Sequence, residues 1–384
     1  MLLTSLRLRN FRNHLDSTFD FGIGTNLLLG ENGHGKTNVL EAISCLCLSK
    51  SFFGAHDSLC LNCDSELFEI DGSFLTDGGS EQAVRVRYVH PEPAKTVTIG
   101  GHAVEPFSSI VGQFPVVICS PDRAPITTGG PGERRRFVDF VISQASAVYF
   151  QDLLAYRKVL RHRNALLQDR RLSREDSIGA LQPWNLQLAK IGSRLICRRR
   201  DFVREFREFM TAAYCRVAGG NDGAPSLTYR SVIDDVPESA TAGEIEVLLC
   251  EQLLQRASDE FRAAATLVGP QRDEFVFRLD ELELRKFASQ GQHKTFLIAL
   301  KLGEFFYLKE RRGERPILLL DDIFSELDQG RAGRLLEYVG SLGQTFITST
   351  DPGFFPEMAS GSDRRFFVRR GSVIPALAEK EAAA

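Results

Sequence analysis

The sequence lacks any apolar run of the roughly 18–20 residues that a membrane-spanning helix requires, so we expect no transmembrane segment. The opening residues, MLLTSLRLRNFRN, place arginines where a secretory signal needs an apolar core, and we therefore expect no export signal. The 8 cysteines show no spacing typical of a disulfide framework. A reduced, cytoplasmic compartment is the expected location.

Internal repeats and low-complexity linkers are also missing from the sequence. Hydrophobic residues make up 43% of the 384 residues and charged residues 25%, which is the composition of an ordinary globular protein. This composition excludes a disordered chain, a collagen-like fibre and a small disulfide scaffold. A chain of this length is expected to form two or three domains with a sizeable buried core.

Charge is distributed unevenly along the chain. The formal net charge is −3, yet residues 131–215 carry 15 Arg and 2 Lys against 9 acidic residues. One basic segment on an otherwise acidic protein indicates an anionic partner, of which nucleic acid is the usual one. The alternative for such a segment is an ordinary solvated helix face.

The pattern of apolar residues predicts an α/β protein interrupted by long helices. Alternating segments predict a small antiparallel sheet, and Pro115–Cys119 predicts a buried strand. Helical patterns follow at Glu133–Gln168, Pro183–Arg216 and Gly243–Ala265, with Pro183 expected in a first helical turn. We predict a split α/β body of residues 1–125 and 263–384, with a mixed sheet and the antiparallel sheet, around an inserted all-helical domain of residues 126–262.

A glycine-rich segment after the first predicted strands matches the phosphate-loop pattern GxxxxGK[ST]. Its backbone N–H groups would surround phosphate oxygens, and the helix that follows would add the positive end of its dipole. Lys36 would reach the β- and γ-phosphates, and the Thr37 hydroxyl would bind Mg²⁺. The predicted nucleotide-binding residues are Gly30, Glu31, Asn32, Gly33, His34, Gly35, Lys36, Thr37 and Asn38, with no side-chain chemistry assigned to Asn32 or His34.

A second element, Ile317-Leu318-Leu319-Leu320-Asp321-Asp322, predicts a buried parallel strand with two carboxylates at its carboxyl end. Asp321 would hold Mg²⁺, directly or through water, and Asp322 would polarise the attacking water. A third element, Ser289-Gln290-Gly291-Gln292, opens a predicted helix with Ser289 at its N-cap. Such a helix end can bind an anion, although an ordinary well-capped helix is the favoured explanation when this element is taken alone.

Together with Ser325-Glu326-Leu327-Asp328, these three elements resemble the ABC-type ATPase head. The resemblance implies that two subunits enclose two ATP molecules. It implies that Ser289 of one subunit contacts the γ-phosphate held by the other, with Gly291 and Gln292 beside it. Thr350 stands where many such heads carry a switch histidine.

Four further stretches are similar to the RecF family of bacterial recombination mediators: LRLRNFRN at Leu6–Asn13, GGPGERRRFVD at Gly129–Asp139, GPQRD at Gly269–Asp273 and LLDDIFSELD at Leu319–Asp328. The inserted segment is longer than that of a transporter head and lacks the long coiled coils of cohesin-like heads.

The RecF resemblance implies an ATP- and Mg²⁺-dependent DNA-binding protein that acts in the response to DNA damage, including the SOS response. It implies binding to double-stranded and gapped DNA, and loading of the recombinase RecA with RecO-like and RecR-like partners. It further implies an ATP-dependent homodimer, slow DNA-dependent hydrolysis and no membrane partner. The alternative is an ATPase head that energises a membrane or chromosome-tethering complex.

Two weaker patterns stay open. Arg134-Arg135-Arg136 lies at the start of a predicted helix, where the helix dipole makes positive charge unfavourable. Two explanations for the three arginines stay open: contact with a DNA phosphate, or ion pairs with Glu133 and Asp139. Further basic residues that could contact DNA are Arg157, Lys158, Arg161, Arg163, Arg194, Arg198 and Arg199. The Cys60-Leu61-Asn62-Cys63 spacing could supply half of a zinc site, with Cys45 and Cys47 as the nearest candidates for the other half, but buried free thiols are the more common outcome.

Overall fold

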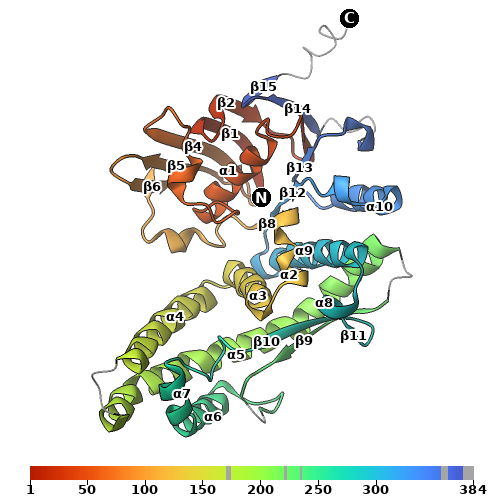
Figure 1. Ribbon diagram of the computed structural model, residues 1–384. Helices are drawn as coiled ribbons and strands as arrows, with labels where there is room; N and C mark the ends of the chain where they lie inside the picture. The colour runs from red at the N-terminus through yellow and green to blue at the C-terminus, as the bar shows by residue number, and fades with distance from the viewer. Residues whose placement is uncertain (170–173, 220–222, 234–235, 356–361, 375–384) are drawn as a thin grey trace, which may run out of the picture. The chain divides into compact units, whose positions relative to one another are not determined.

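The computed structural model describes residues 1–169, 174–219, 223–233, 236–355 and 362–374 (Figure 1). The chain forms two compact units. Unit 1 comprises Met1–Ala124, Phe209–Gly223 and Ser289–Ala384, and unit 2 comprises Pro125–Glu208 and Ala224–Ala288. Among the residues that the structure describes, no helix is both long enough and apolar enough to cross a bilayer.

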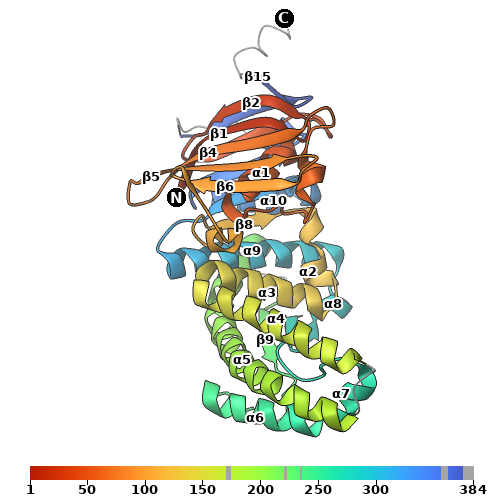
Figure 2. The same ribbon diagram turned by 90° about the vertical axis from the view of Figure 1, so that its left-hand side faces the viewer.

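One layer of unit 1 is a six-stranded antiparallel sheet in the order β2-β1-β4-β5-β6-β7 (Figure 2). Its strands are β1 (Leu2–Phe11), β2 (His14–Asp20), β4 (Leu67–Leu75), β5 (Glu81–Val89), β6 (Ala94–Ile99) and β7 (His102–Ala103). In β5, Val84, Val86 and Tyr88 are buried while Arg85 and Arg87 are exposed. The predicted period-two pattern therefore produces a sheet with one buried face.

The second layer is a six-stranded mixed sheet in the order β15-β14-β3-β13-β12-β8. All pairings in it are parallel except the β14–β15 hairpin. Its strands are β3 (Thr25–Leu29), β8 (Val116–Cys119), β12 (Ile317–Asp321), β13 (Thr345–Ser349), β14 (Arg364–Arg369) and β15 (Ser372–Ile374). Four of these strands, β3, β8, β12 and β13, are buried along their whole length, as expected for parallel strands covered on both faces.

Helix α1 (Lys36–Leu48) packs against strands of both sheets and forms the centre of unit 1 (Figure 1). Its Val39, Ile43 and Leu46 side chains are fully buried in the main hydrophobic core. Unit 1 also contains α9 (Gln290–Arg312), which packs on β8, and α10 (Gln329–Gly340). Short 3₁₀ turns complete it at η1 (Asp57–Cys60), η2 (Phe107–Ile110), η3 (Pro121–Arg123), η4 (Phe324–Glu326) and η5 (Pro352–Phe354).

Unit 2 contains most of the long helices and a three-stranded sheet in the order β11-β10-β9. Its helices are α2 (Pro125–Thr128), α3 (Pro131–Ala145), α4 (Ala147–Gln168), α5 (Arg174–Ala218, of which residues 209–218 belong to unit 1), α6 (Ala242–Gln255), α7 (Ala257–Ala263) and α8 (Leu284–Phe287). The strands are β9 (Pro225–Arg230), β10 (Glu274–Leu279) and β11 (Leu282–Glu283). Because β9 lies within the predicted insertion, that region is not entirely helical.

All three helix predictions need correction. The first predicted helix is divided at Ser146, whose extended backbone ends α3 and whose Oγ accepts a hydrogen bond from the Tyr149 N–H at 3.3 Å. Ser146 is thus the N-cap of α4. Pro183 lies inside α5 and not in its first turn, because the helix already begins at Arg174. The third predicted helix is likewise two helices, α6 and α7.

The two compact units do not follow the domain limits predicted from the sequence. Antiparallel pairing of β10 with β9 brings residues 263–288 into unit 2. The last turns of α5 belong to unit 1, where the rings of Tyr214 and Phe296 have centroids 5.9 Å apart. Arg334 Nε also donates to the Val217 carbonyl at 3.1 Å.

Candidate nucleotide-binding site

The glycine-rich segment forms a tight loop between β3 and α1. Gly30, Gly33 and Gly35 have φ angles of 147°, 76° and 108°, in the region that favours glycine. A Cβ at Gly30 would lie 2.3 Å from the Val368 carbonyl oxygen. The loop therefore has the glycine-dependent curvature that a phosphate-binding loop requires, and it leads directly into the N-terminus of α1.

Lys36, the first residue of α1, folds back over this loop. Its Nζ donates to the carbonyl oxygens of Gly30 at 2.7 Å and Glu31 at 2.9 Å. Burial lowers the pKa of Lys36, and the charges of Asp322 and Asp321 act in the opposite direction. The loop thus contains a largely buried ammonium that is held by neutral carbonyls, with two carboxylates nearby.

Asp321 joins the second predicted element to the loop. Its Oδ1 accepts hydrogen bonds from the hydroxyls of Thr37 and Thr348, each at 2.8 Å. Burial raises the pKa of Asp321, although both hydrogen bonds oppose the increase. The hydroxyl and carboxylate oxygens of Thr37 and Asp321 are the hard donors that Mg²⁺ prefers, and phosphate oxygens and water normally supply its other ligands.

Asp322 lies beyond the end of β12 in a left-handed conformation with φ 50°. Its backbone N–H donates to Thr348 Oγ1 at 2.9 Å, and its side chain is partly exposed. Thr348 therefore orders both carboxylate residues, whereas Thr350, the residue singled out from the sequence, is exposed. The parallel register, which pairs Asp321 with Thr348, explains why Thr348 has this role.

A buried group behind the loop was not predicted from the sequence. The His14 side chain is fully buried, and its Nε2 lies 3.1 Å from the Gly35 carbonyl oxygen. Its Nδ1 lies 3.0 Å from Ser17 Oγ, which donates to the Gly371 carbonyl at 2.8 Å. The Gly371 N–H in turn donates to the His34 carbonyl at 2.9 Å. The β14–β15 turn is thus tied to the phosphate loop at two points.

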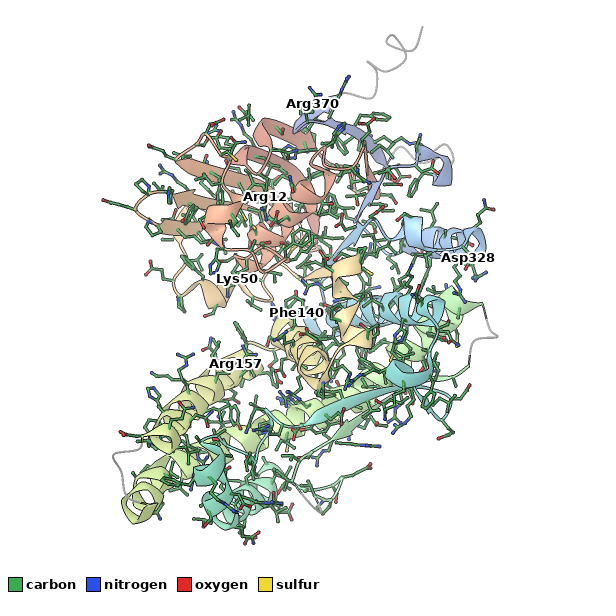
Figure 3. The ribbon with its side chains drawn as sticks, viewed as in Figure 1. Arg12, Lys50, Phe140, Arg157, Asp328 and Arg370 are labelled. Carbon is green, nitrogen blue, oxygen red and sulfur yellow. The ribbon has the colours of Figure 1, made fainter. Side chains whose placement is uncertain are left out.

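Other side chains of the predicted N-terminal motif also support the loop. Asn13 accepts a hydrogen bond from Asn38 Nδ2 at 2.8 Å. Arg12 makes two hydrogen bonds to the buried Glu41 carboxylate on α1, at 2.7 and 2.8 Å (Figure 3). Asn38 is therefore held by Asn13 beside the loop. The exposed residues of the loop are Glu31, Asn32 and Gly33.

The structure places Ser289 at the N-cap of α9. Ser289 Oγ accepts from the Gln292 N–H at 3.2 Å, and Gln292 Oε1 accepts from the Ser289 N–H at 2.8 Å. This capping box fixes the helix start and occupies the Gln292 side chain. Ser289 is exposed, and within the described part of the chain no hydrogen bond links Ser289, Gly291 or Gln292 to the phosphate loop.

The basic residues singled out from the sequence divide into two groups. Arg163 is fully buried and pairs with Glu260 at 2.5 Å, and Arg199 is buried and pairs with Asp139 at 2.8 Å. Both are buried inside unit 2, where acidic residues of the same unit hold them. The exposed group contains Arg157, Lys158, Arg161 and Arg198, whereas the partly exposed Arg194 pairs with Asp152 at 2.5 Å.

The predicted ion pairs of the arginine triplet are only partly present. Arg136 pairs with Glu133, as expected, but Arg134 is buried and pairs with Glu274 at 2.9 Å. Arg135 donates to the Asp273 carbonyl at 2.7 Å. The triplet therefore mainly joins α3 to the start of β10.

The cysteines of the weaker pattern lie in different environments. Cys45, Cys47 and Cys60 are buried, and Cys63 is exposed. Burial raises the pKa of Cys60 to about 12. In the described residues, no group of three or more His, Cys, Asp or Glu side chains is placed to hold a metal ion.

Comparison with known proteins gives consistent relatives. A family model described as an AAA domain matches residues 5–105. The DNA replication and repair protein RecF of Salinibacter ruber is 42% identical over 358 residues, covering 92% of this chain and 86% of that protein. The protein of the same name from Chloroherpeton thalassium is 43% identical over 360 residues, covering 93% of this chain and 97% of that protein.

Solved structures agree with these relatives. The structure of the recombination mediator protein RecF-ATP in the RecFOR pathway matches with a TM-score of 0.87 and 31% identity, covering 97% of this chain and 96% of that chain. The Smc head bound to the C-winged helix domain of ScpA matches with a TM-score of 0.56 and 13% identity, covering 99% of this chain and 100% of that chain. At that identity, the second match shows a shared fold alone.

Proposed function

Because the chain belongs to the RecF family, we propose that it is an ATP-dependent DNA-binding protein of DNA replication and recombinational repair. The names of its relatives support a role in replication and repair, and the RecF-ATP structure supports ATP as the nucleotide. The observation that carries the proposal is the contact between Thr37 and Asp321, which joins the phosphate loop to the end of β12.

The residues of this contact fit a magnesium–nucleotide site. Thr37 and Asp321 would hold Mg²⁺, which neutralises phosphate charge when it is bound. Lys36 would exchange its hydrogen bonds to the Gly30 and Glu31 carbonyls for phosphate oxygens, to which an ammonium binds more strongly than to a neutral carbonyl. The backbone N–H groups from Gly33 to Asn38 would complete the phosphate cradle, while Gly30–Asn32 form the turn.

Hydrolysis requires a group that orients water and a second subunit. Asp322 follows Asp321 and has a partly exposed carboxylate, so it is placed to polarise the attacking water. Ser289 is exposed at the N-terminus of the long helix α9, where its hydroxyl and the N–H of Gly291 can face an anion from outside the subunit. We assign Ser289 to the ATP bound by a second copy, so that ATP stabilises a homodimer and hydrolysis releases it.

The exposed basic residues of α4 support binding to DNA. Arg157, Lys158 and Arg161 are solvent-exposed on one helix, within a segment of residues 131–215 that carries 15 Arg and 2 Lys against 9 acidic residues. We propose that the dimer binds double-stranded DNA at gaps, hydrolyses ATP slowly in response, and promotes RecA loading with RecO-like and RecR-like partners. The partner assignments rest on family membership alone.

A binding titration tests the proposal. Fluorescence anisotropy of a labelled gapped duplex is measured against protein concentration with ATP and with ADP, at two salt concentrations. We expect tighter binding with ATP and a marked loss of affinity at the higher salt concentration. Reversal of charge at Arg157, Lys158 and Arg161 together should weaken binding and reduce its salt dependence. The matched control reverses the charge of Arg256 and Arg262. These two exposed arginines belong to the same unit, and both pair with Asp259.

A negative result would have a definite meaning. If the protein hydrolyses ATP but binds the duplex in neither nucleotide state, the DNA-binding part of the proposal is wrong. The alternative, an ATPase head that energises a membrane or chromosome-tethering complex, would then be the reading to test.

A further inference from the structure

Unit 2 contains a cavity of about 310 Å³ that the ATPase site does not use. Its walls come from α3, α4, α5 and the turn that precedes β10. The charged side chains that line it are Arg135, Arg136, Arg157, Arg199 and Asp139. Four guanidinium groups and one carboxylate thus line the cavity, while Arg136 also pairs with Glu133 and Arg199 lies 3.6 Å from Asp273.

That carboxylate is already paired within the protein. Asp139 accepts hydrogen bonds from Arg199 at 2.8 Å and from the Tyr149 hydroxyl at 2.6 Å. Arg199 also donates to the Pro270 carbonyl at 2.6 Å. Arg199 also lies 3.6 Å from the buried Asp273 carboxylate, so Asp139, Arg199 and Asp273 form the base of the cavity, and Asp139 makes its short contacts with Arg199 and Tyr149.

Arg135 lacks a comparable partner. Its Nη1 donates to a neutral backbone carbonyl, that of Asp273, at 2.7 Å. Throughout the described ranges, no carboxylate makes an ion pair with it. Burial and the charge of Arg199 lower the pKa of Arg135, and Asp273 and Asp139 oppose them. A half-buried guanidinium in this environment is stabilised when an anion binds beside it.

Two neighbours extend the same surface. Arg157, labelled in Figure 3, makes one ion pair among the described residues, with Asp139 at 3.9 Å. Of the Arg157 side chain, 54% is exposed. Gly132 is the second residue of α3, so its N–H has no acceptor within the helix. A Cβ at Gly132 would meet only Arg135 Nη2, at 4.0 Å, so the space beside the helix end is open.

We propose that this cavity binds a phosphoryl group, with Arg135 as the principal contact and Arg157 and the Gly132 N–H beside it. Planar guanidinium groups bind phosphate oxygens through paired hydrogen bonds, and the several oxygens of a phosphoryl group allow it to accept from Arg135, Arg157 and the Gly132 N–H together. The phosphoryl group belongs either to DNA or to a free phosphorylated small molecule. If the phosphoryl group belongs to DNA, the inference rests on the proposed function. Arg135 would then contact a DNA phosphate in addition to the exposed basic residues of α4.

The first experiment uses the full-length protein with inorganic phosphate. Saturating ADP and Mg²⁺ occupy the ATPase site, and phosphate binding is followed by isothermal titration calorimetry. Arg135→Gln should weaken binding about tenfold or more, because a hydrogen bond to a charged group contributes about 1.5–3 kcal/mol. The matched control is Arg204→Gln, which removes an exposed arginine of the same unit and should leave phosphate binding unchanged.

A second variant separates loss of the site from loss of folding. Gly132→Leu keeps every arginine, improves the helix propensity at that position and fills the cavity beside Arg135. It should abolish phosphate binding while the thermal unfolding midpoint stays the same or rises. Arg135→Lys, which keeps the charge but loses the planar fork, should recover only part of the affinity.

Titration of the gapped duplex identifies the source of the phosphoryl group. The ligand is a DNA phosphate if both Arg135→Gln and Gly132→Leu also weaken duplex binding. In that case the slope of the logarithm of the association constant against the logarithm of salt concentration should also become shallower by about 0.9 for the lost contact. If the two variants weaken phosphate binding alone, the ligand is a free phosphorylated molecule. Wild-type phosphate binding in both folded variants would overturn the inference. Failure of wild-type protein to bind DNA would instead count against the proposed function.

Discussion

Thr37 and Asp321 share a hydrogen bond of 2.8 Å although they lie 284 residues apart in the chain. One residue follows β3 and the other ends β12, and β13 lies between these strands in the sheet. Because the parallel strands all end at the same edge, the loop and the acid meet there and form one site. The predictions below follow from this site and from the residues that support it.

Lys36→Ala should reduce ATP turnover by about 10²-fold or more, because removing a positioned group that stabilises charge in the transition state has an effect of this size. The buried ammonium also holds the carbonyls of Gly30 and Glu31, so nucleotide affinity should fall as well. Steady-state phosphate release and binding of a fluorescent ATP analogue measure the two effects. Lys50→Ala changes an exposed lysine just after α1 and serves as the control (Figure 3). Turnover at the wild-type rate in Lys36→Ala would remove the phosphate-loop assignment.

Asp322→Asn should preserve ATP binding and reduce hydrolysis by about 10²-fold, the lower range for loss of a general base. ATP-bound dimers should then persist, because the step that releases them is slowed. Size-exclusion chromatography with light scattering, run after ATP addition, measures dimer lifetime alongside turnover. Asp64→Asn, at an exposed position of the same unit, is the matched control. Unchanged turnover in Asp322→Asn would assign the water-polarising role to another residue.

Ser289→Asp separates the capping role of this residue from its proposed contact with ATP. Aspartate caps a helix as well as serine does, so the stability of α9 should be retained. Its negative charge would repel the γ-phosphate of a second subunit and abolish ATP-driven dimerisation. Ser289→Asn, which also caps but carries no charge, should dimerise more readily than Ser289→Asp. Analytical ultracentrifugation at saturating ATP measures dimerisation of each protein. If the wild type and Ser289→Asp dimerise equally, Ser289 does not contact the ATP of a second subunit.

Glu260→Ala should destabilise unit 2 by about 3–5 kcal/mol, because it leaves a buried arginine without its counter-ion. Arg163 and Glu260 are both fully buried and 2.5 Å apart, with Asn185 and Thr266 as further partners of Arg163 at 2.8 Å. Urea unfolding followed by circular dichroism measures the change. The double variant Arg163→Met with Glu260→Leu should regain most of the lost stability, since apolar groups of similar volume can replace a buried pair. A double variant no more stable than Glu260→Ala would show that packing, and not charge, is responsible.

His14 should make the stability of unit 1 depend on pH. Burial lowers its pKa in the folded state, and the hydrogen bonds to Gly35 and Gly371 only partly oppose this. The unfolded chain therefore binds a proton near pH 6.5, before the folded protein does, and stability falls as the pH decreases through that value. The slope contributed by one histidine is at most about 1.4 kcal/mol per pH unit. His14→Gln should flatten the dependence in urea titrations at pH 5 to 8, whereas the exposed His102→Gln should not.

The sequence predicted the parts of the site that lie within single continuous segments. Lys36 and Thr37 follow the buried strand β3 by a short loop, Asp321 ends the buried strand β12 and Asp322 comes directly after it. Each of these patterns can therefore be recognised within a few adjacent residues. Ser289 was predicted as an N-cap for the same local reason, and α9 begins there.

The supporting residues could not be predicted because their contacts depend on strand order and register. Thr348 meets Asp321 only because β13 lies beside β12 in a particular register. Gly371 meets the loop only because β14 pairs with β3. The missed strand β9 did carry a local signal, since Leu227 and Tyr229 alternate with polar residues. Pro183 was misplaced because the helix pattern before it is weak.

The position of β3 in the mixed sheet affects how the protein is made. Both neighbours of this strand, β13 and β14, are more than 300 residues further along the chain. At about 5–20 residues per second, the ribosome needs roughly 17–70 seconds after β3 to complete them. Throughout that time the apolar segment Leu27-Leu28-Leu29 has no partners from its own sheet, so we expect a chaperone to bind the nascent chain there, and the Thr37–Asp321 contact cannot form before β12 has been made.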